Sequence, residues 1–446
     1  MNFILKIIVL FLRIITFLIS PVINLKVIIQ QTTRIAFVRS IDNFLNERNN
    51  NKNFNRTIYI IIRELPICNI FLSNLVEKKI KEIHKNSYFF NINKFFSYWM
   101  SSRRRISLGK KDLFTVDQKP WISPYFNEND KKLWEVKKGI INDKKKSDNS
   151  KKNYTQYYTD FLFNYDYVKN PQINLNYNEI GVENKFLNKF NLEKKKWICI
   201  HNRDSSYLKN LALQSNFKNY NFQYHNYRDS DVNKLIKSTK LLLENNFYVF
   251  RMGRIQSNEM NFKHPNFIDY AFEDGQSDFN DIFLLSKCEA YLGSDSGPGD
   301  ISLVSGRARF LMNYSLTMLH YFHHGGAELS KKNHYSLIFK HLYDETTKKK
   351  LSLKEIINKQ LMGLSNSNGF KRAGIVPIEN SEEEILDLTI EMTNFLENKK
   401  FNIEKDYEIQ KKFWDIYYAN TQYRRFEDIP VRICSKFLSK NMYILE

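Results

Sequence analysis

Residues 290–312 constrain the fold of this chain more than any other stretch. They begin with a short apolar segment typical of a buried strand, and residues 293–299 then have the composition of a tight turn. Residues 300–305 favour a helix, which Gly306 ends, and the segment after it returns to a strand pattern. The stretch therefore predicts one βαβ unit with a loop of small residues at the entry to its helix.

The loop of this unit, GSDSGPG, has a composition that suits an anion. Backbone N–H groups and the positive end of the helix dipole converge at a helix entry, and glycines let a phosphate approach the backbone closely. Ser294, Asp295 and Ser296 add side chains that can hydrogen-bond a ribose or a sugar. By itself the loop fits an ordinary strand-to-helix turn equally well, so its surroundings must decide.

Strand and helix patterns alternate from residue 197 to this unit. Alternation of this kind is typical of a doubly wound α/β domain built on a parallel sheet. The predicted strands are residues 197–200, 247–252, 267–271, 290–292 and 308–312, and the predicted helices between them are residues 232–245 and 279–287.

The N-terminal half has the same pattern in weaker form. Strands are predicted at residues 27–30 and 57–62, and helices at residues 37–48 and 68–84. A chain of 446 residues has room for two domains, each with its own core. We therefore expect two Rossmann-like domains, residues 26–190 with Lys- and Asn-rich insertions and residues 191–395, followed by C-terminal helices, residues 396–446, that can pack back on the first domain.

Residues 1–25 are apolar but carry interrupting charges. Lys6 and Arg13 leave only short apolar stretches, whereas a spanning helix needs about 20 apolar residues in a row. Lys6, Arg13 and Ser20 share one stripe of a helix, so we expect an interfacial helix on the anionic inner face of the cell membrane, with the protein in the cytoplasm. A spanning anchor and a helix packed on the first domain are the alternatives.

The formal net charge of +20 calls for an anionic partner or surface. Nucleic acid, anionic lipid and a phosphorylated substrate all qualify, and so does a merely solvated basic surface. No motif of a nucleic-acid-binding fold accompanies the charge, so we predict no nucleic-acid partner. The four cysteines lie far apart without CxxC spacing, which indicates buried thiols in a reducing compartment.

Polar residues follow the predicted strands of the second domain. His201 and Arg203 come after the first strand, Arg251 ends the second, and residues 294–297 follow the fourth, while Asp269 sits within the third. The carboxyl ends of parallel strands form the edge where such sheets bind ligands. Two arginines and a helix N-terminus on one edge suit a diphosphate.

Several kinds of site lack a motif in this chain. There is no GxxxxGK[ST] loop and no GxGxxG, so nucleotide hydrolysis and dinucleotide redox chemistry have no support. His320, His323 and His324 have helical spacing but no paired carboxylate. We therefore predict no metal site and no cofactor.

Six segments stand in order along residues 197–392: ICIHNRDSSYL, YHNYRDSD, YVFRMG, SDFNDIFLLSKCEAYLGSDSGP, LSLKEII and ENSEEEILDLTIEM. Together they resemble a family of bacterial surface-polysaccharide glycosyltransferases of the GT-B type, which have two Rossmann-like domains with a cleft between them. The YLGSDSGP segment also resembles the donor-site loop of heptosyltransferases, and the HNR segment resembles the HxR loop of fucosyltransferase-like enzymes. The resemblance covers the C-terminal half and hardly touches residues 100–190.

The resemblance implies metal-independent transfer of a sugar from a nucleotide-sugar donor to a surface-polysaccharide or lipid-linked glycan acceptor. Arg203, together with Arg251, would neutralise the leaving diphosphate. Asp204 and His225 are candidates for the base that deprotonates the acceptor hydroxyl, with Asp42 and Asp229 as alternatives.

The implied site falls into two groups of residues. The catalytic candidates are Arg203, Asp204 and His225. The donor-binding candidates are His201, Asn202, Tyr227, Arg228, Arg251, Gly253, Ser294, Asp295, Ser296 and Gly297.

Two other functions fit parts of this pattern. A nucleotide-sugar epimerase on the same fold would convert the donor without any acceptor. A basic nucleic-acid-binding protein would bind with steep salt dependence.

Overall fold

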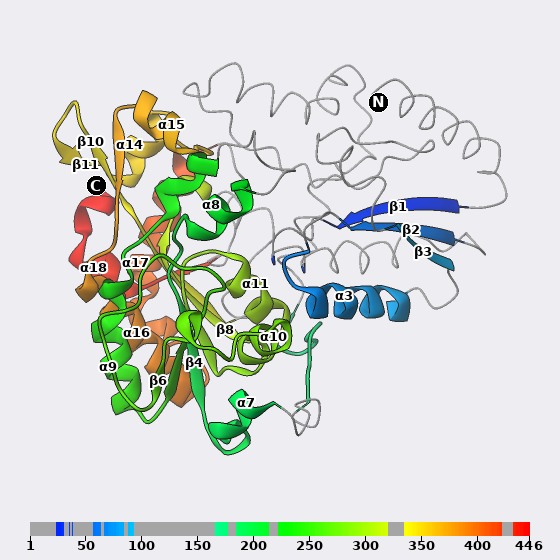
Figure 1. Cartoon of the computed structure of the whole chain (residues 1–446). Helices are drawn as coiled ribbons and strands as arrows, with labels where there is room; N and C mark the ends of the chain where they lie inside the picture. Colours follow the sequence, from blue (N-terminus) through cyan, green and yellow to red (C-terminus); the bar gives the residue numbers. More distant parts are fainter. Residues whose placement is uncertain are drawn as a thin grey trace. The chain divides into compact units, whose positions relative to one another are not determined.

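The structure is a computed structural model of the whole chain. It describes residues 24–30, 35, 38, 57–63, 67–83, 88–92, 166–176, 184–213, 222–319, 334–421 and 431–446. The chain divides into two compact units, Met1–Val116 and Asp117–Glu446 (Figure 1). The domain limits expected from the sequence stay predictions.

The first unit contains a parallel sheet in the order β1-β2-β3. Its strands are β1 (Asn24–Gln30), β2 (Thr57–Arg63) and β3 (Tyr88–Ile92), with both pairings parallel. Helix α3 (Ile70–Ile83) connects β2 to β3. The parallel pairing of β2 with β3 requires such a crossover connection, so this unit contains a βαβ arrangement, as the second unit does.

Helix α3 buries Leu72, Val76 and Ile80, which are four residues apart and therefore lie on one face. The strands predicted at residues 27–30 and 57–62 and the helix predicted at residues 68–84 are confirmed. Strand β3 has no counterpart among the predicted strands. The predicted helix at residues 37–48 lies outside the described residues, and so do residues 1–23. In the described part of the chain, no helix combines the length and apolar character needed to cross a bilayer.

The second unit is organised around a seven-stranded sheet in the order β13-β9-β8-β7-β4-β5-β6. All of its pairings are parallel. The strands are β4 (Trp197–His201), β5 (Tyr248–Arg251), β6 (Phe267–Ile268), β7 (Ala290–Gly293), β8 (Ala308–Tyr314), β9 (Tyr335–Phe339) and β13 (Arg432–Ile433).

The strand order reverses between β4 and β7. From β4 the chain builds outward through β5 to β6, then returns to the other side of β4 with β7 and builds outward through β8 and β9. This is the order of a Rossmann-like sheet, in which the reversal is the topological switch point. The predicted α/β class with a parallel sheet is therefore confirmed for this unit.

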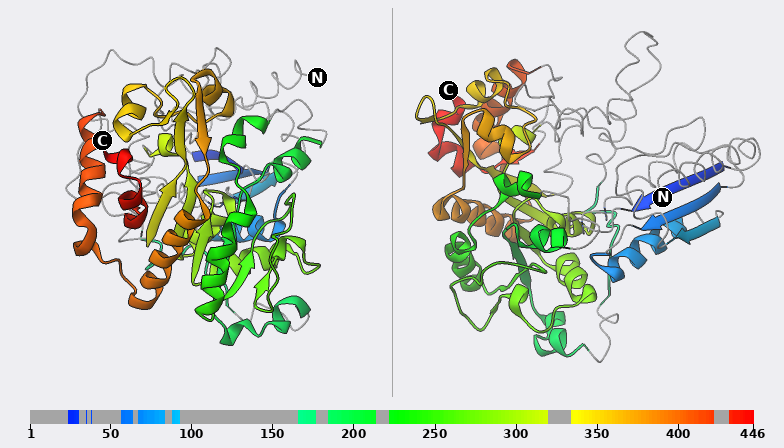
Figure 2. Two further views of the ribbon diagram at one scale, coloured as in Figure 1. Left: turned by 90° about the vertical axis from the view of Figure 1, so that its left-hand side faces the viewer. Right: turned by 45° about the horizontal axis from the view of Figure 1, so that its top comes forward.

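Helices cover both faces of the sheet. Helices α9 (Ile236–Glu244) and α16 (Glu382–Asn398) lie on one face, and α10 (Asp278–Lys287) and α11 (Gly297–Val304) on the other (Figures 1 and 2). Because both faces are covered, β4, β7 and β8 are buried along their whole length, and even Arg309 and Asn313 of β8 are buried.

Shorter elements complete the second unit. A small antiparallel sheet has the order β11-β10-β12. These strands are β10 (His341–Asp344), β11 (Lys349–Lys350) and β12 (Ile375–Ile378). The further α-helices are α7 (Lys185–Lys189), α8 (Ser206–Leu213), α14 (Leu353–Asn358), α15 (Ser367–Arg372), α17 (Ile403–Ala419) and α18 (Ser435–Lys440), and a 3-10 helix, η5, covers Phe222–Arg228.

A capping box starts helix α16 at Ser381. The Glu384 N–H donates to the Ser381 hydroxyl at 3.2 Å, and the Ser381 N–H donates to the Glu384 carboxylate at 2.9 Å. Two backbone donors at the start of α16 are thereby satisfied, which is why this helix begins directly after Ser381.

The third strand of the second domain ends earlier than predicted. Strand β6 stops at Ile268, and Asp269 lies just beyond it instead of within a strand over residues 267–271. Its carboxylate accepts hydrogen bonds from Arg251 at 2.9 and 3.0 Å and from the Met260 N–H at 2.9 Å. Asp269 follows β6 directly and therefore also belongs to the carboxyl edge.

Candidate functional site

Two predicted loops meet at the switch point. In the sheet register, His201 of β4 lies opposite Gly293 of β7. The Ser294 N–H donates to the His201 carbonyl at 3.0 Å, and the Arg203 N–H donates to the Ser294 hydroxyl at 3.1 Å. A Cβ atom on Gly293 would lie 2.3 Å from the His201 carbonyl oxygen, so only glycine allows this approach. The two loops form one hydrogen-bonded surface.

The entry of α11 opens onto the same edge. Ser296 is the N-cap residue, but its hydroxyl donates to the Ser294 carbonyl at 3.1 Å and lies 3.2 Å from the Tyr291 hydroxyl, and its side chain caps no helix N–H. Pro298 occupies the first turn and has no N–H to offer. The remaining first-turn N–H groups and the helix dipole favour an anion at this position.

Arg203 lies across the strand ends instead of pointing into solvent. Its side chain is 9% exposed and forms an ion pair with Asp229, whose side chain is 26% exposed. The same guanidinium donates to the His225 carbonyl at 3.1 Å. Both partners lie on residues 222–231, which we call the cover segment.

The cover segment is bonded to residues that follow three strands of the sheet. The Ser230 N–H donates to the Arg203 carbonyl after β4 at 3.0 Å. Arg228 donates to the Asp295 carbonyl after β7, and its guanidinium lies 3.8 Å from the Asp295 carboxylate. Lys340, directly after β9, donates to the Asp229 carbonyl at 2.5 Å. The segment therefore crosses the carboxyl edge from β4 to β9.

Aromatic contacts and Ser367 hold the other side of the cover segment. The Tyr227 N–H donates to the Ser367 hydroxyl at 3.0 Å, and the Tyr227 ring lies 5.2 Å from the Phe370 ring of α15. The His225 ring lies 3.9 Å from the Tyr224 ring. Burial raises the pKa of Tyr227, so its hydroxyl stays protonated and can donate a hydrogen bond.

Burial shifts the pKa values of two ionisable groups at this edge, Asp229 and Lys340. Burial raises the pKa of Asp229 to about 6, although Arg203 favours the carboxylate. Burial lowers the pKa of Lys340 to about 8. Ionisable groups perturbed in this way gather at functional sites more often than elsewhere, and these two lie within one hydrogen-bonded cluster.

His201 is a buried neutral group. Burial lowers its pKa to about 4, and its Nδ1 lies 2.8 Å from the Met252 carbonyl. A carbonyl can only accept, so Nδ1 carries the proton and Nε2 is an acceptor at neutral pH. The ring can hold a hydroxyl group but is not a cation for a phosphate.

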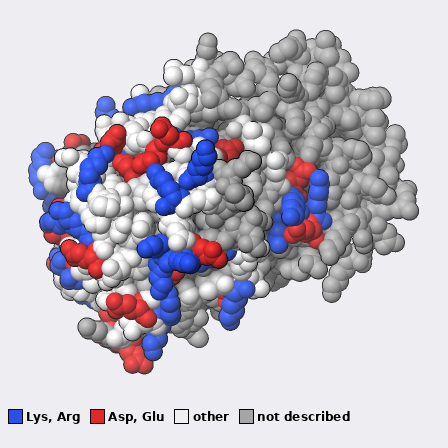
Figure 3. Space-filling model, turned by 60° about the horizontal axis from the view of Figure 1, so that its bottom comes forward, with Lys and Arg blue, Asp and Glu red and all other residues white. Residues whose placement is uncertain are grey.

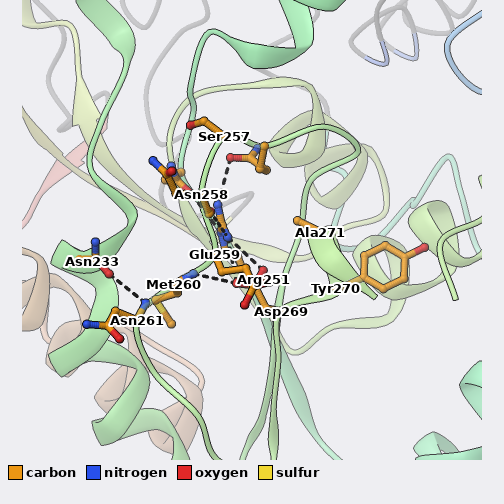
Figure 4. Close-up of polar contacts among 12 residues, drawn as sticks. Asn233, Arg251, Ser257, Asn258, Glu259, Met260, Asn261, Asp269, Tyr270 and Ala271 are labelled. Atoms are coloured by element: carbon orange, nitrogen blue, oxygen red, sulfur yellow. Dashed lines mark hydrogen bonds and ion pairs between the residues drawn. The ribbon is translucent and has the colours of Figure 1, made fainter. Parts of the chain in front are cut away.

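The Arg251 guanidinium forms an ion pair and hydrogen bonds with neighbouring side chains of the same domain (Figure 4). Its fully buried guanidinium pairs with Asp269 at 2.9 Å, donates to the Asn202 side chain at 3.2 Å, and donates to Gln256 at 3.2 Å. Gly253 lies against this cluster, since a Cβ atom there would be 2.7 Å from the Gln256 amide nitrogen. The geometry gives Arg251, Asn202 and Gly253 a positioning role behind the strand ends, and a direct contact with a donor stays a prediction.

Asp204 is also occupied by local bonds. Its carboxylate accepts from the Ser206 N–H at 2.9 Å and from the Ser257 N–H and hydroxyl, both at 2.8 Å. Burial by itself raises the pKa of Asp204, but these hydrogen bonds more than offset it, so the net pKa is lowered. A carboxylate of this kind accepts a proton weakly, which counts against the predicted role as a base.

No protein-family model, curated protein or solved structure matches this chain. Functional inference therefore rests on the geometry of this edge. The predicted resemblance to polysaccharide glycosyltransferases has no further support from these comparisons.

A hollow of about 430 Å³ lies away from the switch point, beside β6. The acidic side chains Glu259 and Glu273 around this hollow form ion pairs, Glu259 with Lys263 at 3.1 Å and Glu273 with Lys189 at 3.8 Å. Within the described ranges, His, Cys, Asp and Glu side chains form no group able to hold a metal ion. The histidines at residues 320–324 and the base candidate Asp42 lie outside those ranges.

The surface of the second unit does not present one sign of charge on the face drawn in Figure 3. Lys and Arg side chains there are interspersed with Asp and Glu among the described residues. Ion pairs such as Arg254 with Asp278 at 3.3 Å and with Asp281 at 3.2 Å account for part of this mixing. A continuous basic surface of the kind that binds a nucleic-acid backbone is absent from that described face.

The sequence does not indicate two residues of this edge, Lys340 and Ser367, and it indicates Asp229 only among several candidate bases. Lys340 follows the apolar run YSLIF, which is itself a strand signal that could have placed it at a strand end. Ser367 belongs to α15 and had no local signal. The sequence indicates Asp229 only as an alternative base. Its contact with Arg203 depends on the path of the cover segment through the fold, which local sequence does not encode.

Proposed function

We propose that the carboxyl edge of β4 and β7 binds the diphosphate of a nucleotide sugar, and that the protein transfers the sugar to a surface-polysaccharide or lipid-linked glycan without a metal ion. The observation that carries this proposal is the direct bonding of the Arg203 and Ser294 loops at 3.1 Å, beside the entry of α11. This hydrogen bond holds the loop that carries Arg203 beside the entry of α11, at the edge where a Rossmann-like sheet binds phosphates.

Arg203 supplies the charge in this proposal. In sugar transfer, negative charge develops on the leaving diphosphate, and a buried guanidinium stabilises it more than an exposed one. A phosphate that binds Arg203 competes with the Asp229 carboxylate, which is already an anion at that position. The cation site is thus prepared for an anion before the donor arrives.

Of the described base candidates, Asp229 fits best. Its pKa of about 6 lies near the working pH of a general base, whereas Asp204 is held by three hydrogen bonds. When a phosphate takes over Arg203, the Asp229 carboxylate loses its ion-pair partner and becomes a stronger base. His225 stays in the proposal as a residue of the cover segment that can contact the acceptor.

A GT-B arrangement, in which the first unit faces this edge and contributes the acceptor site, belongs to the same proposal. So does membrane association through residues 1–25, which brings the enzyme to a lipid-linked acceptor. Neither the epimerase nor the nucleic-acid-binding alternative is favoured by a particular contact in the described residues.

A ligand screen tests the proposal. The full chain is heated with each nucleoside diphosphate and each nucleotide sugar, and a ligand at 100 times its Kd stabilises it by about 2.7 kcal/mol. The nucleotide sugar that stabilises the chain is then incubated with lipid-linked acceptor, and the product is analysed with and without chelator. Stabilisation by none of the nucleotides contradicts the proposal, and conversion of the donor without acceptor supports an epimerase instead.

A further inference from the structure

Lys340 is a buried cation at this edge, and it has no assigned role in the proposed sugar transfer. It follows β9 directly, and its N–H donates to the Tyr314 carbonyl at 2.9 Å, so its backbone is held at the end of the sheet. The residue is 5% exposed. Burying an ammonium group costs free energy unless an anion or several acceptors compensate it.

The Lys340 ammonium bonds a carbonyl instead of a carboxylate. It donates to the Asp229 carbonyl at 2.5 Å, and within the described ranges it forms no ion pair. The nearest acidic groups are engaged elsewhere, because the Asp229 carboxylate pairs with Arg203 and Glu379 pairs with Lys234 at 3.1 Å. An ammonium group has three donors, so it retains capacity for a further acceptor.

Lys340 and Arg203 converge on one residue from two strands. Arg203 contacts the carboxylate of Asp229, and Lys340 contacts its carbonyl. Both cations therefore contact the same residue, one at its side chain and the other at its main chain. Two cations so placed suit an anion with two adjacent charged groups better than an anion with one.

Among the described residues, charged groups of both signs act on the Lys340 ammonium. Asp229 and Glu379 attract it, whereas Lys234 and Arg203 repel it, and burial outweighs them all in lowering its pKa to about 8. With a pKa of about 8, the ammonium is mostly charged at neutral pH and loses its charge in mildly alkaline solution. An anion bound there is held less tightly once the proton leaves.

We infer that Lys340 binds the second phosphate of a nucleoside diphosphate, with Arg203 on the first, and that it sets the preference of this site for diphosphates over monophosphates. The inference rests on the proposed function of the same edge. In this role Lys340 selects the ligand, in addition to holding the cover segment through the Asp229 carbonyl.

The test measures affinities of the full chain for a nucleoside diphosphate and for the matching monophosphate. The nucleoside is the one selected by the ligand screen, and the proteins are the natural chain, Lys340→Met and Lys340→Arg. We expect Lys340→Met to lose roughly tenfold or more in affinity for the diphosphate, with little change for the monophosphate. Lys340→Arg should keep most of the preference, because it keeps the charge.

A pH series on the natural chain adds a readout that does not depend on a variant's folding. Affinity for the diphosphate should fall as pH rises through about 8, and Lys340→Arg should remove this fall. Equal losses for both nucleotides in Lys340→Met, or a flat pH profile, would overturn the inference and leave Lys340 as a clamp on the cover segment. A natural chain that binds no nucleoside diphosphate overturns the proposed function as well.

Discussion

The backbone N–H of Arg203 donates to the Ser294 hydroxyl at 3.1 Å, although the two residues are 91 positions apart in the sequence. Arg203 follows β4 and Ser294 follows β7, so this bond ties the two loops on either side of the switch point. Both groups are buried. The bond therefore sets where the predicted phosphate-binding loop stands relative to the predicted cation.

Removing this bond should lower stability. Ser294→Ala leaves a buried N–H without its acceptor, and we expect a loss of about 1–3 kcal/mol in the free energy of unfolding. Ser439→Ala is the matched control, since the exposed Ser439 hydroxyl donates to the Ser435 carbonyl of its own helix. Urea unfolding of the three proteins makes the comparison. Equal stabilities would show that the bond contributes nothing measurable.

Removing the cation should remove sugar transfer. Arg203→Ala is expected to lower kcat by about 100- to 1000-fold, because the charge on the leaving diphosphate loses its buried partner. Arg254→Ala is the control, since Arg254 is 40% exposed and pairs with carboxylates of α10. The rates are compared at equal amounts of folded protein, with Arg203→Lys as a charge-retaining variant. Unchanged turnover in Arg203→Ala would eliminate Arg203 from the reaction.

Arg251 should matter for folding more than for donor binding. Arg251→Met leaves the Asp269 carboxylate without its buried partner, and we expect a loss of about 3–5 kcal/mol. Lys263→Met, which breaks an exposed pair with Glu259, should cost less than about 1 kcal/mol. Thermal unfolding and nucleotide affinity are both measured. A stable Arg251→Met protein with weakened nucleotide binding would instead support the direct donor contact predicted from the sequence.

His201 should make stability depend on pH in mildly acidic solution. Its pKa falls from about 6.5 to about 4 on folding, so between these values the unfolded chain binds a proton that the folded chain does not. Stability is therefore lost as pH falls through this window, by about 3 kcal/mol in total. His201→Gln should flatten that part of the profile. An unchanged slope between pH 6.5 and 4 would mean that other groups determine it.

The N-terminal segment should confer membrane binding. Deleting residues 1–23, which leaves β1 whole, is expected to release the chain from vesicles that contain anionic lipid, because the predicted apolar and basic helix is lost. Sedimentation with anionic and with neutral vesicles measures this, and a variant with Lys6 and Arg13 both changed to Gln separates charge from apolar burial. Persistent binding of the deleted chain to anionic vesicles would assign the interaction to another surface.

Much of the second unit was predictable from local pattern. The strands predicted at residues 197–200 and 290–292 and the helix predicted at residues 279–287 agree with the structure. Each depends on contacts within a few residues, such as a cap bond or an uninterrupted apolar run. Such signals survive in the sequence because they act over one turn or one strand.

The outer strands were harder to predict. Strand β13 has only two residues, Arg432 and Ile433, and it pairs with β9 almost a hundred positions earlier. Arg432 is buried there because Glu391 and Asp406 surround its guanidinium, with bonds of 3.1 Å to each. A two-residue strand has no periodicity of its own, so only the neighbouring strand makes it one.

The sequence by itself determined the α/β pattern, the small-residue loop at the entry of α11 and the presence of Arg203 at a strand end. Tertiary structure alone decided what those residues face. It turned Arg251 inward onto Asp269, placed Asp229 against Arg203, and brought Lys340 to the same edge. The reason is physical: local pattern encodes hydrogen bonding and burial along one element, whereas the pairing of buried charges depends on which strand ends the sheet order makes neighbours.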